Sequence, residues 1–284
     1  MDPRLWQRFV RNRGALVGAV LVALVVLLAG VGPWFAPHAP ARQFTDRLIT
    51  QHGLPRGPLE VPGFVLGADP IGRDELSRLL YGGRVSLQVA CLATLVALII
   101  GLGVGVTTGY FGGAFDFAWM RFIDVVLSLP FLLIAMALNQ VVDNPALWSL
   151  ALLLGLLSWT TLARVTRAKT MQVCRLDYVQ AARALGLGHT AILWRHVLPN
   201  VLGPAIVIAT TLVAQMVLVE SAMSYLGLGV TPPAASWGSM LREGQEMLAH
   251  VPRLVVFPGL LISATVFGFN LLGEGLRDAL DPKT

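Results

Sequence analysis

Residues 177–200 read DYVQAARALGLGHTAILWRHVLPN and form a polar, basic stretch within an otherwise apolar chain. Asp177 is followed three residues later by Gln180, which is an aspartate version of the capping box, so we predict that Asp177 caps a short helix. Gly186 and Gly188 come next, and glycines commonly end helices because they adopt backbone conformations that other residues avoid. The stretch therefore begins with a short helix and a glycine turn.

A second short helical run follows the glycines, and we place it at residues 190–197. Pro199 comes directly after it. Proline is tolerated in the first turn of a helix, because the N–H that it lacks would have no partner there. We therefore expect Pro199 to begin the long apolar segment that covers residues 201–229.

The composition of the whole chain is that of a membrane protein. Of 284 residues, 55% are hydrophobic and only 13% are charged, and the mean hydropathy is +0.70. Roughly 20 helical residues cross the hydrocarbon core of a bilayer. Apolar runs of about that length cover residues 14–36, 85–109, 117–141, 146–163, 201–229 and 254–272. We therefore predict an all-α integral membrane protein with six transmembrane helices, in contact with lipid.

The distribution of basic residues predicts how the chain lies in the membrane. Four arginines precede the first span, and residues 164–200 carry six Lys or Arg against one acid. Cytoplasmic loops are enriched in Lys and Arg. We therefore place both termini and residues 164–200 in the cytoplasm, and we attribute the net charge of +5 to these loops and not to binding of nucleic acid.

Residues 180–199 resemble the cytoplasmic EAA loop of ABC-importer permeases. The family signature is E-A-A, three residues, Gly, nine residues, Ile, one residue and Leu-Pro, and the spacing here is the same. The matching positions are Gln180, Ala181, Ala182, Gly186, His196, Leu198 and Pro199. Gln in place of Glu and His in place of Ile are similar to the dipeptide and oligopeptide branch, whose motif typically ends R-H-x-L-P-N, as residues 195–200 do.

Two further stretches carry the same resemblance. Residues 67–87 resemble the G-T-D-x-x-G-R-D-x-x-S-R-x-x-x-G-x-R-x-S-L segment of the C-type subunits of dipeptide and oligopeptide permeases, with Ala68 in place of Thr. Residues 270–282 resemble the N-x-L-G-D-G-L-R-D-x-L-D-P ending of the family. The resemblance covers residues 67–284 well and the first span loosely.

The resemblance implies a type I ABC-importer permease of a bacterial inner membrane, which encloses half of a pathway for di- or oligopeptides. It implies a second, B-type permease chain, two ATP-binding subunits and an extracytoplasmic substrate-binding protein as partners. The loop at residues 164–200, with Asp177 at the start of its first helix, would dock onto an ATPase subunit. ATP and Mg would be bound by the partners, and no cofactor by this chain.

The expected division of the chain follows from the same reading. Residues 1–13 form a cytoplasmic N-terminus, residues 14–36 the first span, and residues 37–84 an extracytoplasmic loop that ends in a short amphipathic segment. Residues 85–284 form a core of five spans.

Catalytic motifs are missing from the sequence. It contains no G-x-x-x-x-G-K-[ST], H-E-x-x-H or G-x-S-x-G arrangement, and its five His residues are scattered without the spacing of metal ligands. We therefore expect neither catalytic nor metal-binding residues, and we do not expect the chain to be the ATPase.

Three charged residues are candidates for the pathway or its gate. Glu220 lies within the fifth span, where an ionisable side chain should face the bundle interior or a watery cavity. It either borders the substrate path or serves as a hydrogen-bond anchor near the outer interface. Arg73 and Asp74 either place the gate or meet a binding protein, or else belong to a solvated interfacial helix.

Other transport functions stay open at this point. The nickel-importing branch shares these motifs, and nothing in the sequence separates a peptide from another small solute. An ion-coupled secondary transporter would show inverted repeats and paired carboxylates at mid-membrane, whereas Glu220 stands alone in its span.

Overall fold

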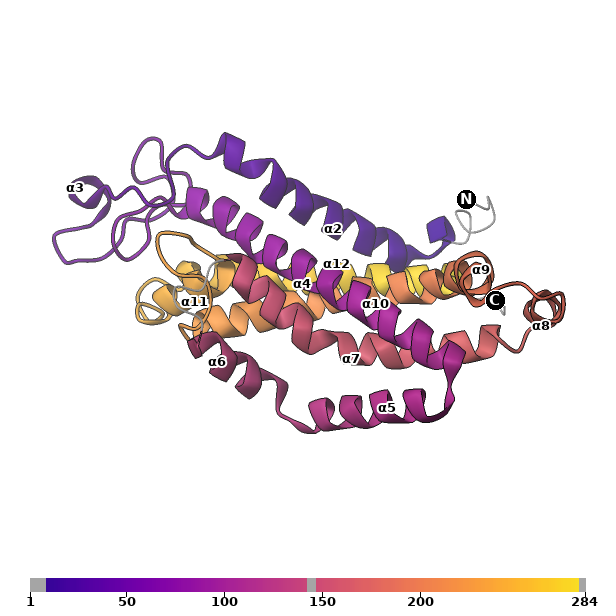
Figure 1. The fold of residues 1–284 in the computed structure, drawn as a ribbon. Coiled ribbons are helices and arrows are strands. Elements are labelled where there is room, and N and C mark those ends of the chain that lie inside the picture. Colours follow the sequence, from indigo (N-terminus) through magenta and orange to yellow (C-terminus); the bar gives the residue numbers. More distant parts are fainter. Residues whose placement is uncertain (1–8, 142–146, 281–284) are drawn as a thin grey trace.

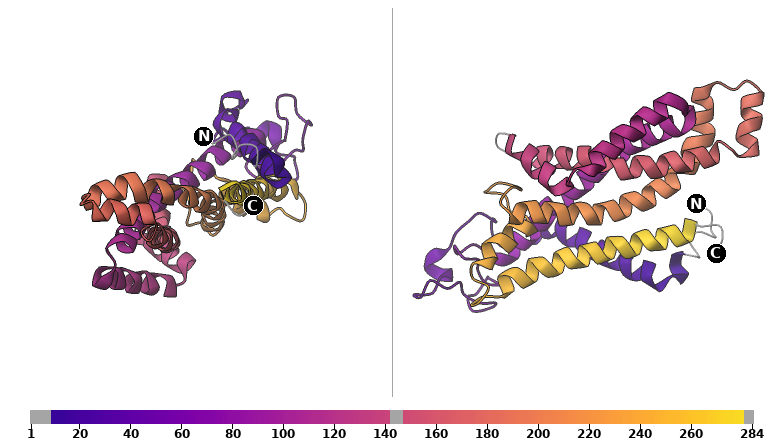
Figure 2. Two further views of the ribbon diagram at one scale, coloured as in Figure 1. Left: turned by 90° about the vertical axis from the view of Figure 1, so that its right-hand side faces the viewer. Right: turned by 90° about the horizontal axis from the view of Figure 1, so that it is seen from below.

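The computed structural model describes residues 9–141 and 147–280, which are mostly helical and contain no β-strand. Five helices within this part are long and apolar enough to cross a membrane. They are α2 (Arg13–Gly30), α4 (Glu75–Phe111), α7 (Leu147–Val173), α10 (Leu198–Tyr225) and α12 (Arg253–Leu280). They lie roughly side by side (Figures 1 and 2).

The remaining predicted span, residues 117–141, which is the third along the chain, is broken. Its residues belong to α5 (Gly113–Ser128) and α6 (Phe131–Val141), which meet at an angle of 87°. Leu129 and Pro130 separate them, and a residue before proline is driven out of the helical conformation; Leu129 accordingly has extended backbone angles. Six crossings are reached only if this bent pair counts as one span.

Helix α4 begins ten residues before the predicted start of the second span. Asp74 is its N-cap and accepts a hydrogen bond from the backbone N–H of Ser77. The amphipathic segment near residue 84 is therefore not a separate element but the first turns of α4, and it is continuous with the membrane span. With 37 residues, α4 is roughly 55 Å long, which exceeds the thickness of a hydrocarbon core of about 30 Å.

Small residues allow α4 and α7 to lie close together along their length. A Cβ atom at Gly109 would lie 2.7 Å from the carbonyl oxygen of Arg167, and one at Gly101 would lie 3.0 Å from that of Trp159. Arg121 and Asp124 form an ion pair on α5, at 3.4 Å.

The bundle has two distinct ends (Figure 1). The α8 end carries α8 (Asp177–Ala184), α9 (His189–Ile192), the start of α2 and the end of α12. The Asn12 side-chain amide donates to Asp278 at 2.9 Å and joins the start of α2 to the end of α12. The α11 end carries α3 (Thr45–Leu48) and α11 (Trp237–Gln245). The start of α2 and the end of α12 therefore lie at the same end as residues 177–200, as an even number of crossings requires.

Candidate functional site

The predicted helix, turn and helix is present at the α8 end, but its start differs from the prediction. Asp177 is not the cap: it is the first residue of α8, and Leu176 occupies the cap position without a side-chain hydrogen bond. Gln180 does not complete a capping box either, because its side-chain amide donates to the carbonyl oxygen of Cys174 at 2.7 Å. The capping-box prediction is wrong because the chain turns tightly after α7, where the N–H of Leu176 bonds to the carbonyl of Val173 at 3.1 Å; the helix therefore begins one residue early.

Gly186 ends α8 as predicted. Its φ is +79°, in the left-handed region that favours glycine. Two backbone hydrogen bonds close the turn in a Schellman motif, one from Gly186 to Arg183 at 3.1 Å and one from Leu187 to Ala182 at 3.2 Å. A Cβ at Gly186 would meet nothing within 4 Å in this chain, so the glycine is required by the backbone conformation.

The second helical run joins the next span without a break. Helix α9 is followed by a π-helical segment, Leu193–Val197 (η2), which contains His196 and leads directly into α10. Leu198 and Pro199 form the first turn of α10, as predicted for the proline. Because Pro199 has no N–H to donate, the helical ladder is locally disrupted here; the Asn200 side-chain amide donates to the carbonyl of His196 at 2.7 Å.

One face of this loop is anchored on the bundle. Val179, Ile192 and Val197 are fully buried, in a cluster with Val106 at the end of α4 and Val173 at the end of α7. Residues at the matching motif positions divide between the two faces: Ala182 is buried, whereas Gln180 and Ala181 are exposed. The loop is therefore packed against the ends of three spans and presents its other face outward.

Aromatic and histidine side chains add polar contacts that the sequence did not reveal. The Tyr110 hydroxyl lies 2.8 Å from Nδ1 of His189, which joins α4 to α9. The Arg183 guanidinium lies over the Tyr110 ring, 5.3 Å from its centroid. On the other side the Asn200 amide donates to the Tyr178 hydroxyl at 3.1 Å. These contacts connect α8, α9 and α10 into one unit.

The outward face carries large apolar side chains. Leu185 is 81% exposed and Trp194 is 71% exposed. Exposed apolar side chains of this size are typical of a surface that another protein or the membrane covers. The buried cluster therefore connects this exposed face to the ends of α4, α7 and α10.

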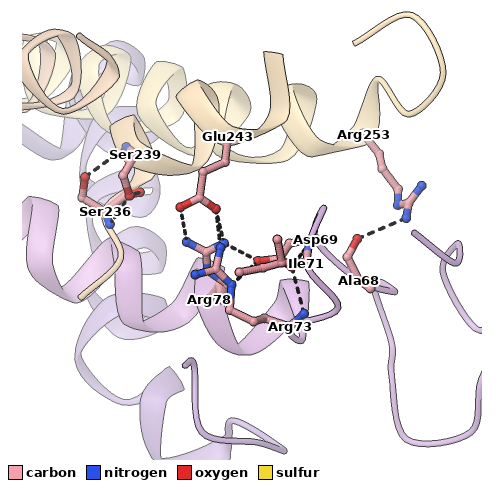
Figure 3. Close-up of polar contacts among 9 residues, drawn as sticks. All are labelled: Ala68, Asp69, Ile71, Arg73, Arg78, Ser236, Ser239, Glu243 and Arg253. Atoms are coloured by element: carbon pink, nitrogen blue, oxygen red, sulfur yellow. Dashed lines mark hydrogen bonds and ion pairs between the residues drawn. The ribbon is translucent and has the colours of Figure 1, made fainter. Parts of the chain in front are cut away.

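The second group of predicted residues lies at the α11 end, in a network of charges between the start of α4 and α11 (Figure 3). Arg73 and Arg78 each pair with Glu243 of α11, at 2.5 Å, and each also pairs with Asp69. A second hydrogen bond joins Arg78 to Glu243 at 3.1 Å. Arg78 is almost fully buried, so its charge is matched by two carboxylates within the protein.

Asp74 serves the helix and not an open surface. It is fully buried and accepts hydrogen bonds from the N–H of Ser77 at 3.2 Å and from the hydroxyl of Ser77 at 2.5 Å. Nearby, the Arg253 guanidinium at the start of α12 donates to backbone carbonyls of the extended loop, including that of Arg56 at 2.6 Å. The loop before α4 is thereby held against both α11 and α12.

Glu220 is fully buried near the same end. Its carboxylate accepts a hydrogen bond from the Ser224 hydroxyl at 2.7 Å, and Ser86 on α4 and Ser236 before α11 lie close to it, whereas its Oε2 atom has no hydrogen-bond partner among the described residues. The N–H of Trp237 donates to Ser86 at 3.2 Å. Glu220 therefore lies buried where α4, α10 and the start of α11 meet.

The sequence prediction includes one of the four charged residues in this network. It names Arg73 but not Asp69, Arg78 or Glu243. Asp69 and Arg78 belong to the family-like segment at residues 67–87, which was the available signal. Glu243 lies 165 residues after Arg78, and nothing local in the sequence pairs the two.

The chain matches two family models. Residues 101–284 match the binding-protein-dependent transport system inner membrane component, and residues 4–52 match the N-terminal TM domain of oligopeptide transport permease C.

Curated relatives match over almost the whole chain. The chain is 41% identical over 278 residues to the dipeptide transport system permease protein DppC of Escherichia coli K12, covering 98% of this chain and 92% of that protein. It is 35% identical to the oligopeptide transport system permease protein OppC of Haemophilus influenzae, covering 98% and 89%. It is 34% identical to the glutathione transport system permease protein GsiD of Pectobacterium atrosepticum, covering 98% and 90%.

Among solved structures, the crystal structure of an amino acid ABC transporter with histidines has a similar fold. The TM-score is 0.50 at 18% identity, and the match covers 70% of this chain and 91% of that one. Together with five apolar helices and a sixth, broken span, these matches establish that the chain is a multi-pass membrane protein that belongs to the family of binding-protein-dependent transport system inner membrane components.

Proposed function

We propose that this chain is the C-type permease subunit of an importer for di- and oligopeptides, and that it couples its half of the pathway to separate ATPase subunits through α8 and α9. The observation that carries the coupling role is the protruding loop, which is packed on the ends of α4, α7 and α10. The names of the relatives support a peptide substrate.

The proposal includes partners that this chain would need. A B-type permease chain would complete the pathway, two ATP-binding subunits would bind ATP and Mg, and an extracytoplasmic protein would deliver the substrate. The α8 end would then face the cytoplasm and the α11 end the outside. The chain itself would bind no cofactor and act as a transport subunit, in agreement with its family.

Within this function, Arg73, Asp74 and Glu220 would close the outer end. Arg73 joins the segment before α4 to Glu243 of α11, Asp74 caps α4, and Glu220 is buried in α10. Opening the pathway outward would require some of these contacts to rearrange, because packed helices switch between discrete arrangements.

A related substrate is a second candidate. Glutathione is transported by a relative that is 34% identical over nearly the whole chain, and nickel or another small solute belongs to the same group of alternatives. Family membership removes the ion-coupled secondary transporter from consideration.

The coupling role is tested by Gly186→Glu in the complete complex. A charged side chain at the tip should abolish dipeptide-stimulated ATP hydrolysis while the complex still assembles, because the tip would no longer fit its partner. Gly53→Glu is the matched control: Gly53 also has a positive φ, of +74°, and open space around its Cβ, but it lies in the loop before α4. Normal coupling in Gly186→Glu would refute the assignment.

A further inference from the structure

A cleft of about 660 Å³ opens near the α8 end between α7, α10 and α12. The cleft is lined by Val207 and Ile208 of α10, by Lys169 of α7 and by Glu274 and Arg277 of α12. The volume lies in the range of small-molecule sites, about 300–1,000 Å³.

The three charges at this cleft have no counterpart in the part of the chain that the structure describes. Neither Lys169 nor Glu274 nor Arg277 forms an ion pair or a hydrogen bond there. On the same helix as Lys169, by contrast, Arg164 pairs with Asp124 and Arg167 pairs with Asp116. Pairing is thus the rule for basic residues of this helix, and Lys169 departs from it.

A track of polar side chains continues from the cleft toward the middle of the bundle. A smaller hollow of about 90 Å³ shares Ile208 and Thr211 with the cleft and is also lined by Thr161 and Gln215. Gln215 is exposed, although it lies well inside the apolar helix α10. An amide facing hydrocarbon is costly, so this face of α7 and α10 meets water or protein and not lipid.

We propose that this cleft is a transient binding site for a zwitterionic peptide in the inner half of the pathway. This inference rests on the proposed import of peptides. Lys169 and Arg277 attract the C-terminal carboxylate, Glu274 attracts the N-terminal ammonium group, and Val207 and Ile208 contact apolar side chains. Glu274 and Arg277 are exposed and Lys169 is half-buried, so each charge pair with the peptide is worth about a two- to fivefold change in affinity. Weak attraction suits a site that the substrate must leave.

The test is protection of a cysteine within the cleft, in the complete complex in lipid nanodiscs. Thr211→Cys is introduced with Cys91→Ser and Cys174→Ser, and its reaction with 2-sulfonatoethyl methanethiosulfonate is timed. Alanyl-phenylalanine should slow the reaction. The same peptide with an acetylated N-terminus and an amidated C-terminus should not, because it lacks both charges.

Charge variants make the test specific. Lys169→Gln and Arg277→Gln should each raise the dipeptide concentration for half-protection about two- to fivefold. Arg13→Gln, which removes a positive charge at the same end but outside the cleft, should leave it unchanged.

Three results would overturn the site: Thr211→Cys fails to react because another chain covers the cleft, the blocked peptide protects equally, or the charge variants behave as wild type. Dipeptide-stimulated ATP hydrolysis by the wild-type complex is measured in parallel. If it is absent, the proposed function fails; if it is present without charge-dependent protection, only the site fails.

Discussion

Gly186 and Gly188 flank the turn between α8 and α9, yet only one of them needs to be glycine. Gly186 has a φ of +79° and Gly188 a φ of −64°, and a Cβ at either would meet nothing within 4 Å. Any difference between alanine variants at the two positions therefore measures backbone conformation and not steric contact.

We predict that Gly186→Ala destabilises the turn by about 1–2 kcal/mol, the cost of a left-handed non-glycine residue, while Gly188→Ala has little effect. Amide hydrogen exchange at residues 186 and 187, whose N–H groups donate to Arg183 and Ala182, should accelerate by about five- to thirtyfold in the first variant only. Equal exchange in the two variants would show that the turn does not depend on the left-handed conformation.

Cys174 lies just after α7, in the same loop, and the protonation of its thiol can be followed by its reactivity. Burial raises the pKa of its thiol, and the nearby Arg183 guanidinium lowers it in part. Because the thiolate is the reactive form, a raised pKa leaves less of it at neutral pH.

In a Cys91→Ser background, the rate of iodoacetamide reaction at Cys174 should rise with a midpoint above that of free cysteine, about 8.5. Arg183→Gln should move the midpoint further up, since it removes the charge that favours the thiolate. A midpoint below that of free cysteine in the same buffer would contradict this account.

At the scale of elements, α11 is held to α4 by charges whose partners are far apart in sequence. Glu243 is 32% exposed, whereas the Arg78 side chain is 3% exposed. Removing the carboxylate charge therefore leaves a buried guanidinium that, among the described residues, keeps Asp69 as its ion-pair partner, and this loss is the costly part of the change.

We predict that Glu243→Gln lowers the stability of the complex by about 1–3 kcal/mol, seen as a lower apparent Tm. Glu246→Gln is the control, since Glu246 also lies at the end of α11 but is exposed. Equal melting of the two variants would mean that the network adds nothing to the attachment of α11.

Much of the arrangement of elements could be predicted, because it follows from local properties. The lengths of the apolar runs predicted the five regular spans, and Gly186 predicted the end of α8. The start of α4 was missed because the residues between Asp74 and the apolar run are polar, and their burial against α11 depends on contacts with a distant segment.

The broken span and the cap of α8 show two other limits. The Ser-Leu-Pro sequence at residues 128–130 carried the signal for the break, but an apolar run of this length hides it. The capping box at Asp177 met the sequence rule, yet the tight turn after Val173 started the helix earlier. Of the candidate site, the loop was predictable from spacing, whereas the charge network required the positions of helices that are distant in sequence.

At the scale of the whole molecule, the two ends of the bundle define a topology. We predict that the α8 end faces the cytoplasm, from the excess of Lys and Arg in residues 164–200. In a Cys91→Ser, Cys174→Ser background, His52→Cys should react with a membrane-impermeant maleimide from outside intact spheroplasts. Arg175→Cys should react only in inside-out vesicles, and the reverse pattern would invert the orientation.

The contact between α2 and α12 has a practical consequence for watching this protein move. A Cβ at Gly18 would lie 2.6 Å from the backbone nitrogen of Leu272, and one at Gly268 would lie 3.2 Å from that of Val22, so the first helix is seated directly on the last. If α12 tilts during a transport cycle, α2 must move together with it. A spin label near Arg13 would therefore report the swing of α12 from a position outside the cleft.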